Sequence, residues 1–466
     1  MSAPHVLAPA DAPVLNAPLL DSPLRPRPAP GFEPVCAVGG IEEHRLAANG
    51  LRVLYLEWRA APVALLMVTY DVGSRHEPAH ARGASHMLEH LMFKGSAGFN
   101  AEAGTSIFDL LHPVGAQTNA TTWLDRTHYF NLVPVAHLET AARIEADRMR
   151  GLRMAPADLA AEREVVLNEH DQCANDPLEA LNHAVWRAAF PRHPYGHPVI
   201  GTRQDILGLT REALSTHYEL HYRPAHATLT VIGDVARDDA LALVRRCFEA
   251  MPADGPPRPP DVAPEPPQRG ERRVAVAHPG QPGWVMLAYA SPHGASPDID
   301  ALELLGGILL GSRSSRLQAT MIANGLAATG WCAVSRLRHA GLFQAQALLG
   351  AAQDHAGAER AMREAVASIR RDGVARAELD RARGRARGAL LASRDGPVAM
   401  AMQLNEAIAM GDWTTYATQA ARLEAVTVDD IQRVARRYLV DEALTVGHLV
   451  RTADDAAARA IAGVQA

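Results

Sequence analysis

Two histidines and a glutamate within five residues form the clearest chemical pattern in this sequence. His86, Glu89 and His90 stand in the order H-x-x-E-H, with Met87 and Leu88 between them. On a helix, residues four apart share a face, so the two imidazoles can bind one Zn²⁺ while Glu89 lies beside them. The pattern favours a zinc hydrolase in which Glu89 is the general base.

The residues around this motif indicate a half-buried helix. Apolar side chains occupy positions 87, 88 and 91–93, interleaved with the polar triplet, and Gly95 follows as a helix stop. A surface helix that happens to carry two histidines is the alternative, because a five-residue match needs support from its context. The cysteines, which form no C-x-x-C pair, argue against a thiolate-bound structural zinc site: Cys36, Cys173, Cys247 and Cys332.

A catalytic zinc site needs a third protein ligand and an open position for water. Segment 155–189 is predicted to be mostly helical, with a break at Pro177. Within it Glu162 and Glu169 are two helical turns apart and therefore share a face. Because Arg163 and Glu164 are charged too, the spacing alone leaves open whether these carboxylates face inward or belong to a solvated outer face.

The two motifs together resemble the pitrilysin-type (inverzincin) metallopeptidases. In that family the H-x-x-E-H pair is followed by E-R-x-V-V-x-x-E, which residues 162–169 match. The bacterial two-domain members and the beta subunit of the mitochondrial processing peptidase are the forms that this chain resembles most. The similarity covers most of residues 40–450 and includes the segments 46–53, 73–78, 93–96, 119–122, 125–129 and 222–234.

The resemblance implies a complete metal centre. His86, His90 and Glu169 would be the zinc ligands, and Glu89 would accept a proton from water and pass it to the leaving amine. Glu162 would help to orient the metal site from outside the ligand set. Imidazole and carboxylate ligands favour zinc over Mn²⁺ without excluding the latter.

The activity that the resemblance implies is zinc-dependent endoproteolysis of short or unfolded peptides inside a closed chamber. Asn119 would lie on the strand that receives the substrate backbone. Two alternatives stand beside this reading. A non-catalytic scaffold subunit of the same fold is disfavoured by the intact motif, and a short-chain lyase with the same motif order is disfavoured by the two-domain length.

The chain departs from the family at one point. Self-sufficient members carry, in their second domain, an arginine and a tyrosine seven residues apart that hold the substrate carbonyl. The corresponding segment, 315–328, has Met321 and Ala328 at those positions, and neither side chain donates a hydrogen bond. We therefore expect a heterodimer in which a related, zinc-free subunit supplies the Arg/Tyr pair. A homodimer, or an enzyme that uses other donors, is the alternative.

The length of 466 residues exceeds what one core usually supports, and two proline-rich stretches divide it. The expected division is a proline-rich N-terminal arm, a zinc-binding domain, a stiff linker and a metal-free second domain of the same fold, at residues 1–38, 39–250, 251–270 and 271–466. A weak repeat of 222–231 at 438–446 favours a duplication. In that register the positions of His86, Glu89 and His90 correspond to Leu302, Leu305 and Gly306 in the second half.

The predicted fold class is α+β, with two similar domains that each pack helices on a largely antiparallel sheet and together form a clam-shell chamber. In the first half, strands are expected at 41–57 (a hairpin around Asn49-Gly50), 61–72, 117–122 and 127–133, and helices at 134–150, 156–186, 210–220 and 237–250.

Charge and hydropathy exclude two further classes of protein. The net charge of −6 and the lack of a dense Lys/Arg run argue against a nucleic-acid surface. No apolar run reaches the roughly 18 residues that a membrane span needs. Without a signal-peptide layout the expected compartment is the cytoplasm, or the periplasm if a leader has been removed.

Overall fold

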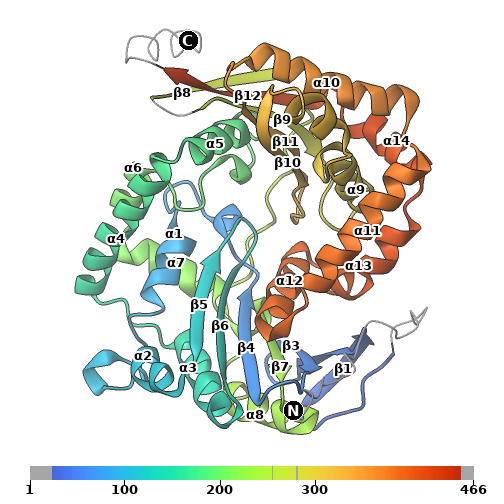
Figure 1. The fold of residues 1–466 in the computed structure, drawn as a ribbon. Coiled ribbons are helices and arrows are strands. Elements are labelled where there is room, and N and C mark those ends of the chain that lie inside the picture. Colours follow the sequence, from blue (N-terminus) through green and yellow to red (C-terminus); the bar gives the residue numbers. More distant parts are fainter. Residues whose placement is uncertain (1–23, 254, 280–281, 453–466) are drawn as a thin grey trace, which may run out of the picture.

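A computed structural model describes residues 24–253, 255–279 and 282–452. Within these residues the strands form two sheets, each packed with helices, which confirms the predicted α+β class (Figure 1). The first sheet has the order β1-β2-β3-β7-β4-β6-β5, and only β3 and β7 are parallel neighbours in it. Its strands are β1 (Phe32–Val38), β2 (Ile41–Leu46), β3 (Arg52–Glu57), β4 (Val63–Tyr70), β5 (Gln117–Thr122), β6 (Thr127–Pro134) and β7 (Ala227–Gly233).

The second sheet has the order β10-β11-β9-β12-β8, with β8 and β12 as its parallel pair among the described residues. Its strands are β8 (Arg272–Pro279), β9 (Trp284–Ser291), β10 (Ala327–Val334), β11 (Gly341–Leu349) and β12 (Leu444–Thr452). The order and the place of the parallel pair repeat those of β3-β7-β4-β6-β5 in the first sheet. The two halves therefore share one topology, to which the first adds β1 and β2.

Helices cover both sheets. The first half contains α1 (Ala84–Leu91), α2 (Ile107–Leu111), α3 (Leu138–Arg150), α4 (Pro156–Ala174), α5 (Pro177–Ala189), α6 (Arg203–Gly208), α7 (Arg211–His221) and α8 (Arg237–Phe248). The second contains α9 (Asp298–Leu310), α10 (His355–Asp372), α11 (Arg376–Ala392), α12 (Gly396–Met410), α13 (Thr414–Ala425) and α14 (Val428–Tyr438).

Equivalent residues occupy equivalent places in the two halves. Tyr222 follows α7 and precedes β7, and Tyr438 ends α14 before β12. Helix α9 takes the position of α1, and its Leu302 and Leu305 are buried in the core of the second half. The second half thus has core leucines where the first half has the histidine motif.

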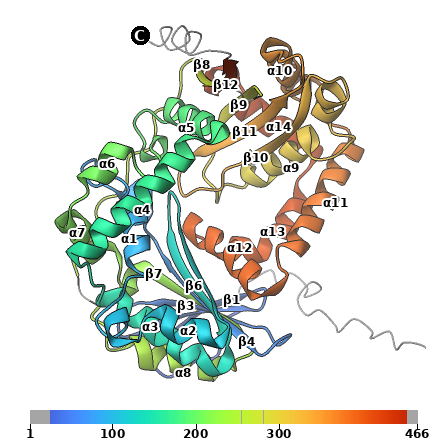
Figure 2. The ribbon, with the colours of Figure 1, turned by 60° about the vertical axis from the view of Figure 1, so that its left-hand side comes forward.

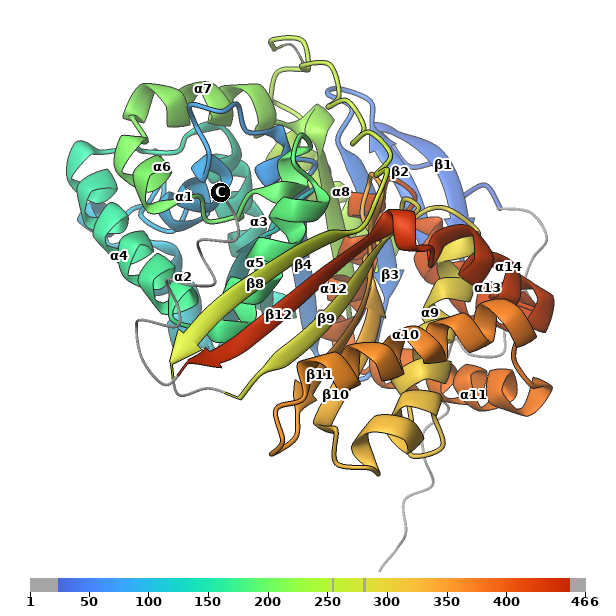
Figure 3. The ribbon, with the colours of Figure 1, turned by 90° about the horizontal axis from the view of Figure 1, so that it is seen from above.

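Two helices cross from one half to the other. Helix α5 lies on the second sheet, where Leu181 and Val185 share a buried cluster with Met286 and Leu449 (Figure 3). Helix α12 lies on the first sheet, where Leu404 and other apolar residues pack against Leu65, Met67 and Ile232 (Figures 1 and 2). Each of these two helices buries apolar side chains against the sheet of the other half, and this burial stabilises the contact between the halves.

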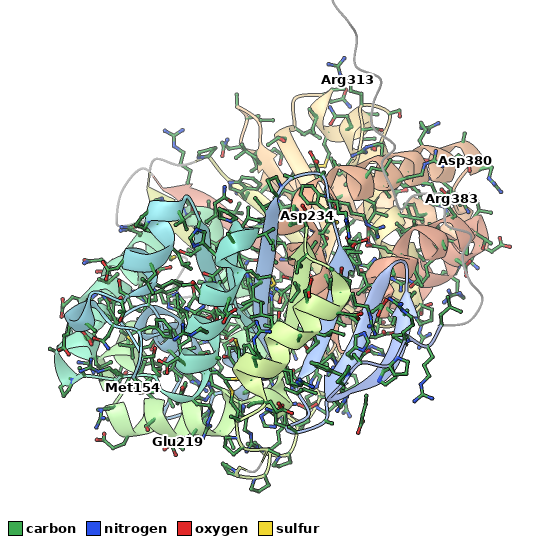
Figure 4. The ribbon with its side chains drawn as sticks, turned by 90° about the horizontal axis from the view of Figure 1, so that it is seen from below. Met154, Glu219, Asp234, Arg313, Asp380 and Arg383 are labelled. Carbon is green, nitrogen blue, oxygen red and sulfur yellow. The ribbon has the colours of Figure 1, made fainter. Side chains whose placement is uncertain are left out.

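The outer surface of the second half is charged. Seen from below, Asp380 and Arg383 project from α11 at the rim of the molecule, on the opposite side from Met154 and Glu219 of the first half (Figure 4). The side chains of Asp380 and Arg383 form an i,i+3 ion pair of 3.4 Å. None of the helices in the described part of the chain is both long and apolar enough to cross a membrane.

Several local predictions can be compared with the structure. The strands and helices expected in the first half are present, and the helical segment 155–189 breaks between α4 and α5 next to Pro177. The predicted arm lies outside the described residues up to position 23, and its residues 32–38 form β1 of the first sheet. Residues 251–270 have no helix or strand where they are described. The domain limits themselves stay a prediction.

Candidate metal centre

Helix α1, which carries the histidine motif, is fixed at its N-terminus. Its N-cap residue Gly83 has φ 82°, and a Cβ there would lie 2.7 Å from the carbonyl oxygen of Ile200, so only glycine fits. The carboxylate of Glu77 accepts hydrogen bonds of 2.7 Å from the backbone N–H groups of Gly83 and Ser85. Burial raises the pKa of Glu77 to about 7, and the two hydrogen bonds satisfy backbone N–H groups that have no partner within the helix, so this contact holds the start of the helix in place.

Helix α4 brings the third candidate ligand to the two imidazoles. One carboxylate oxygen of Glu169 lies 3.6 Å from His86 Nε2 and 3.5 Å from His90 Nε2. Two ligands bound to Zn²⁺ at tetrahedral angles lie about 3.3 Å apart, because zinc–ligand bonds are roughly 2.0–2.1 Å long. Among the residues that the structure describes, these three form the one group of His, Cys, Asp and Glu side chains arranged to hold a metal ion.

The protonation states of the three groups suit cation binding. Burial lowers the pKa of His86 to about 4, so this imidazole is neutral at pH 7. Burial acts on His90 in the same direction, but hydrogen bonds to Glu169 and Glu162 outweigh it and raise its pKa. The hydrogen bond from His90 lowers the pKa of Glu169, which is therefore ionised. A cation between the imidazoles would replace the proton on His90 Nε2.

Glu162 holds the ring of His90 from behind. Its Oε2 lies 2.9 Å from His90 Nδ1, and its Oε1 lies 2.5 Å from Lys94 Nζ. With Nδ1–H donating to Glu162, Nε2 is the ring nitrogen of His90 that faces Glu169 and that a cation would bind in place of its proton. Although Glu162 is buried, which by itself raises a carboxyl pKa, the bonds from Lys94 and His90 lower its pKa. Glu162 thus stays ionised and lies in hydrogen-bonding contact with a candidate ligand, and its orienting role stays a prediction.

Glu89, the predicted base, lies next to the imidazoles on α1 and faces strand β5. Its Oε2 accepts a hydrogen bond of 2.6 Å from Thr122 Oγ1. Burial raises the pKa of Glu89, and the bond from Thr122 acts against this effect. A carboxylate whose pKa is raised toward neutrality and whose rotamer is fixed by a hydroxyl suits proton transfer.

A cavity of about 470 Å³ lies between the two halves, and the candidate ligands His86 and Glu169 line it. His86, Glu169 and Thr122 lie on one wall, and the opposite wall comes from the second sheet: Trp331, Ser335, Gln344 and Gln346. Asn119 lies in the middle of β5, one of the two edge strands of the first sheet in the described residues, and its side chain is exposed. Its Oδ1 accepts from the N–H of Ala120.

The two positions that the resemblance assigns to a carbonyl clamp carry no donor. Met321 is buried in the core of the second half, and Ala328 lies exposed near the start of β10. Because Met321 is enclosed by apolar residues, its surroundings are not those of a charged or hydroxylated side chain.

Three supporting residues escaped the sequence reasoning. Thr122, Lys94 and Glu77 contact the base, the orienting carboxylate and the start of α1 respectively. All three lie in segments that resemble the family, at 119–122, 93–96 and 73–78. The family resemblance therefore covers their positions. Their contacts depend on how separate segments of the chain pack together, and residue spacing does not predict that packing. Val165, an apolar residue of the E-R-x-V-V-x-x-E segment, is 47% exposed on α4.

Comparison with known proteins finds matches over both halves. The family model of insulinase (peptidase family M16) matches residues 52–203, and that of the peptidase M16 inactive domain matches residues 208–385. An uncharacterized zinc protease of Mycobacterium tuberculosis is 30% identical over 400 residues, covering 84% of this chain and 89% of the relative. A probable mitochondrial-processing peptidase subunit beta of Arabidopsis thaliana is 25% identical, covering 85% and 76%. The crystal structure of a protease from Helicobacter pylori aligns with TM-score 0.82 at 26% identity, covering 90% of this chain and 99% of that one.

Proposed function

The chain belongs to peptidase family M16, the pitrilysin type, and from this premise we propose that it is a zinc-dependent endopeptidase for short or unfolded peptides. The observation that carries the proposal is the convergence of His86, His90 and Glu169 beside Glu89, at the wall of a cavity between the halves. An intact ligand set next to a poised base favours catalysis over a purely structural role.

The three ligand candidates fit Zn²⁺ by chemistry and by spacing. Two imidazole nitrogens and one carboxylate oxygen are the donors of known catalytic zinc sites, which leave a fourth position open. Zinc so held supplies Lewis acidity and lowers the pKa of a coordinated water to about 7. His86, His90 and Glu169 would hold the ion, and Glu162 would keep the His90 ring in its binding orientation.

The proton is moved by Glu89. In its ionised form its carboxylate accepts the proton of the attacking water, and it then donates this proton to the nitrogen of the leaving amine. Thr122 holds the carboxylate through its hydroxyl, so the same oxygen pair serves both transfers without a change of rotamer.

The substrate backbone would pair with the free edge of β5. Strands at sheet edges have unpaired N–H and C=O groups that an extended peptide can complete. Asn119 lies on this strand, close in sequence to Thr122 and hence to the base. Backbone pairing accepts many side chains, so the volume of the cavity and a few pockets would set the preference for short or unfolded peptides.

We further propose that the active form is a heterodimer. Met321 and Ala328 offer no side-chain donor to the substrate carbonyl, and a related zinc-free subunit would supply an arginine and a tyrosine in their place. Loss of one such donor typically reduces turnover by about 10²–10³. A homodimer, or donors from the amide-bearing wall of the second sheet, is the alternative arrangement.

A quenched fluorescent peptide tests the proposal. The zinc-loaded chain, mixed with a related zinc-free subunit from the same organism, is expected to cleave the peptide, and the Glu89→Gln variant is expected to retain zinc and lose turnover. Glu164→Gln is the matched control, because this glutamate is exposed on α4. Hydrolysis by Glu89→Gln at the wild-type rate would contradict the role of Glu89.

A further inference from the structure

A buried carboxylate outside the metal centre connects three parts of the chain. Asp125, in the turn between β5 and β6, is 1% exposed. Its Oδ1 accepts a hydrogen bond of 2.6 Å from Arg75 Nε, and the hydroxyl of Tyr195 lies 2.8 and 2.7 Å from its two oxygens. The charge of this aspartate is thus balanced by a buried guanidinium, as a buried charge requires.

The same carboxylate reaches the second half. The backbone N–H of Arg338 donates to Asp125 Oδ2 at 2.9 Å, and the N–H of His339 donates to the Tyr195 hydroxyl at 3.2 Å. Arg338 and His339 form part of the turn between β10 and β11. Asp125 and Tyr195 therefore hold a turn of the second sheet through the backbone N–H groups of that turn. Substituting the side chains of Arg338 or His339 would leave these hydrogen-bond donors in place.

The linker closes the third side of this cluster. Asp261, in the irregular stretch between the halves, pairs with Arg75 and lies 3.1 Å from His339 Nε2. Four residues on, Glu265 accepts hydrogen bonds from the N–H groups of Arg192 and His193. The linker is thus fixed to both halves at the point where Asp125 joins them. We refer to Arg75, Asp125, Tyr195, Asp261, Arg338 and His339 together as the clasp.

The clasp lies at one end of the catalytic cavity. Trp123 and Leu124, which directly precede Asp125, line that cavity, and so does Tyr195. Ser335, at the other side of the β10–β11 turn, lines it from the second half. Thr122, the hydroxyl partner of Glu89, ends the strand that leads into the Asp125 turn. A shift of the clasp would therefore move the facing wall relative to the base.

The geometry points to Asp125 and Tyr195 as positioning residues that set the distance between the zinc-bearing wall and the second-sheet wall, and thereby the fit of the peptide. Within the described part of the chain, neither residue forms a hydrogen bond or an ion pair with His86, His90, Glu169 or Glu89. Loosening the clasp should consequently weaken substrate binding and leave the proton transfer itself largely intact. The kinetic part of this inference rests on the proposed peptidase function, and its structural part does not.

Hydrogen exchange followed by mass spectrometry tests the structural part directly. In Tyr195→Phe and Asp125→Asn, the amides of residues 335–341 should exchange about ten-fold faster or more. The first variant removes the acceptor of the His339 N–H, and the second removes the negative charge that accepts from the Arg338 N–H. Tyr218→Phe is the control, because the Tyr218 hydroxyl also accepts from one backbone N–H, that of Leu152, and donates to one oxygen, the carbonyl of Arg148, entirely within the first half. It should leave the 335–341 segment unchanged.

Kinetics on a short peptide test the consequence. Tyr195→Phe should raise KM by about ten-fold and keep kcat within about two-fold, a split that uniform destabilisation does not produce. Unchanged exchange at 335–341 in both clasp variants, faster exchange across the whole chain, or an unchanged KM would each overturn the inference. If neither wild type nor variant hydrolyses any peptide, the proposed function fails, and the exchange experiment still decides whether the clasp exists.

Discussion

Glu89 and Thr122 come from a helix and a strand that are far apart in the sequence, and a hydrogen bond of 2.6 Å joins their side chains. The strand that bears Thr122 is also an edge strand of the first sheet, and Asn119 lies on it. The base and the proposed substrate strand are thus mechanically linked. Movement of β5 on peptide binding would be transmitted to the carboxylate that performs the proton transfer.

Removing the hydroxyl of Thr122 tests this link. Thr122→Val keeps the size of the side chain and leaves Glu89 without its partner, so the carboxylate gains rotamer freedom. We expect kcat to fall by about ten-fold, which corresponds to roughly 1.4 kcal/mol. Steady-state kinetics with Thr121→Val as the control measure the effect, because Thr121 bonds Arg126 and not Glu89. Equal losses in both variants would contradict a specific role of Thr122.

The carboxylate behind His90 should control metal affinity. Glu162→Gln removes the charge that holds His90 Nδ1–H and that pairs with Lys94. Loss of such a partner usually weakens metal binding by about 10–100-fold. Competition for zinc with a chromophoric chelator gives the affinity, and Glu164→Gln on the exposed face of α4 controls for the loss of a charge. Identical affinities in the two variants would show that Glu162 does not orient His90.

Acid should destabilise the junction of the two halves through His128. This imidazole is fully buried, lies 3.1 Å from Asn405 Nδ2 of α12, and has its pKa lowered to about 3 by burial and by Arg126. Since the unfolded imidazole titrates near 6.5, protonation below that pH favours the unfolded chain, and the stability present above pH 6.5 is lost as the pH falls toward 3. By linkage this amounts to about 2 kcal/mol between pH 7 and pH 5.

The comparison of wild type with His128→Gln isolates that contribution. Glutamine does not titrate, so the variant should lose less stability than wild type over the same pH range. Denaturant unfolding at pH 7 and pH 5 measures both proteins. Parallel losses in the two proteins would mean that other groups, such as the buried His217 and His221, dominate the acid response.

Much of the candidate site could be read from residue spacing. His86 and His90 at i,i+4, and Glu162 and Glu169 two turns apart, were placed correctly on two helices because helical periodicity fixes which side chains share a face. Spacing could not show that the two helices meet, and there the family resemblance was needed. The contacts of Thr122 and Lys94 depend on packing between segments and left no periodic signal.

The exchange of helices between the halves was not foreseen either. Pro177 predicted the break before α5, but nothing local distinguishes a helix that packs on its own sheet from one that packs on another. Leu181 and Val185 give α5 an apolar face, and only the tertiary fold shows that this face meets Met286 and Leu449 of the second half. The same holds for α12 on the first sheet.

A partner that supplies the missing donors should restore turnover. Because Met321 is buried and Ala328 has no donor, the isolated chain is expected to cleave peptides slowly, and addition of the zinc-free subunit should raise kcat by about 10²–10³. Titration of one subunit with the other, with light scattering to establish the stoichiometry, measures this gain. Full activity of the isolated chain would instead favour the homodimer or the use of other donors.

The zinc content of three purified proteins tests the central claim most directly. Wild type, Glu169→Ala and Glu164→Ala are dialysed against the same buffered zinc solution, and metal per chain is measured by mass spectrometry. If His86, His90 and Glu169 hold the ion together, wild type and Glu164→Ala will carry one zinc per chain and Glu169→Ala will carry almost none. A wild-type chain without zinc, or a Glu169→Ala chain that retains it in full, would contradict the proposed metal centre.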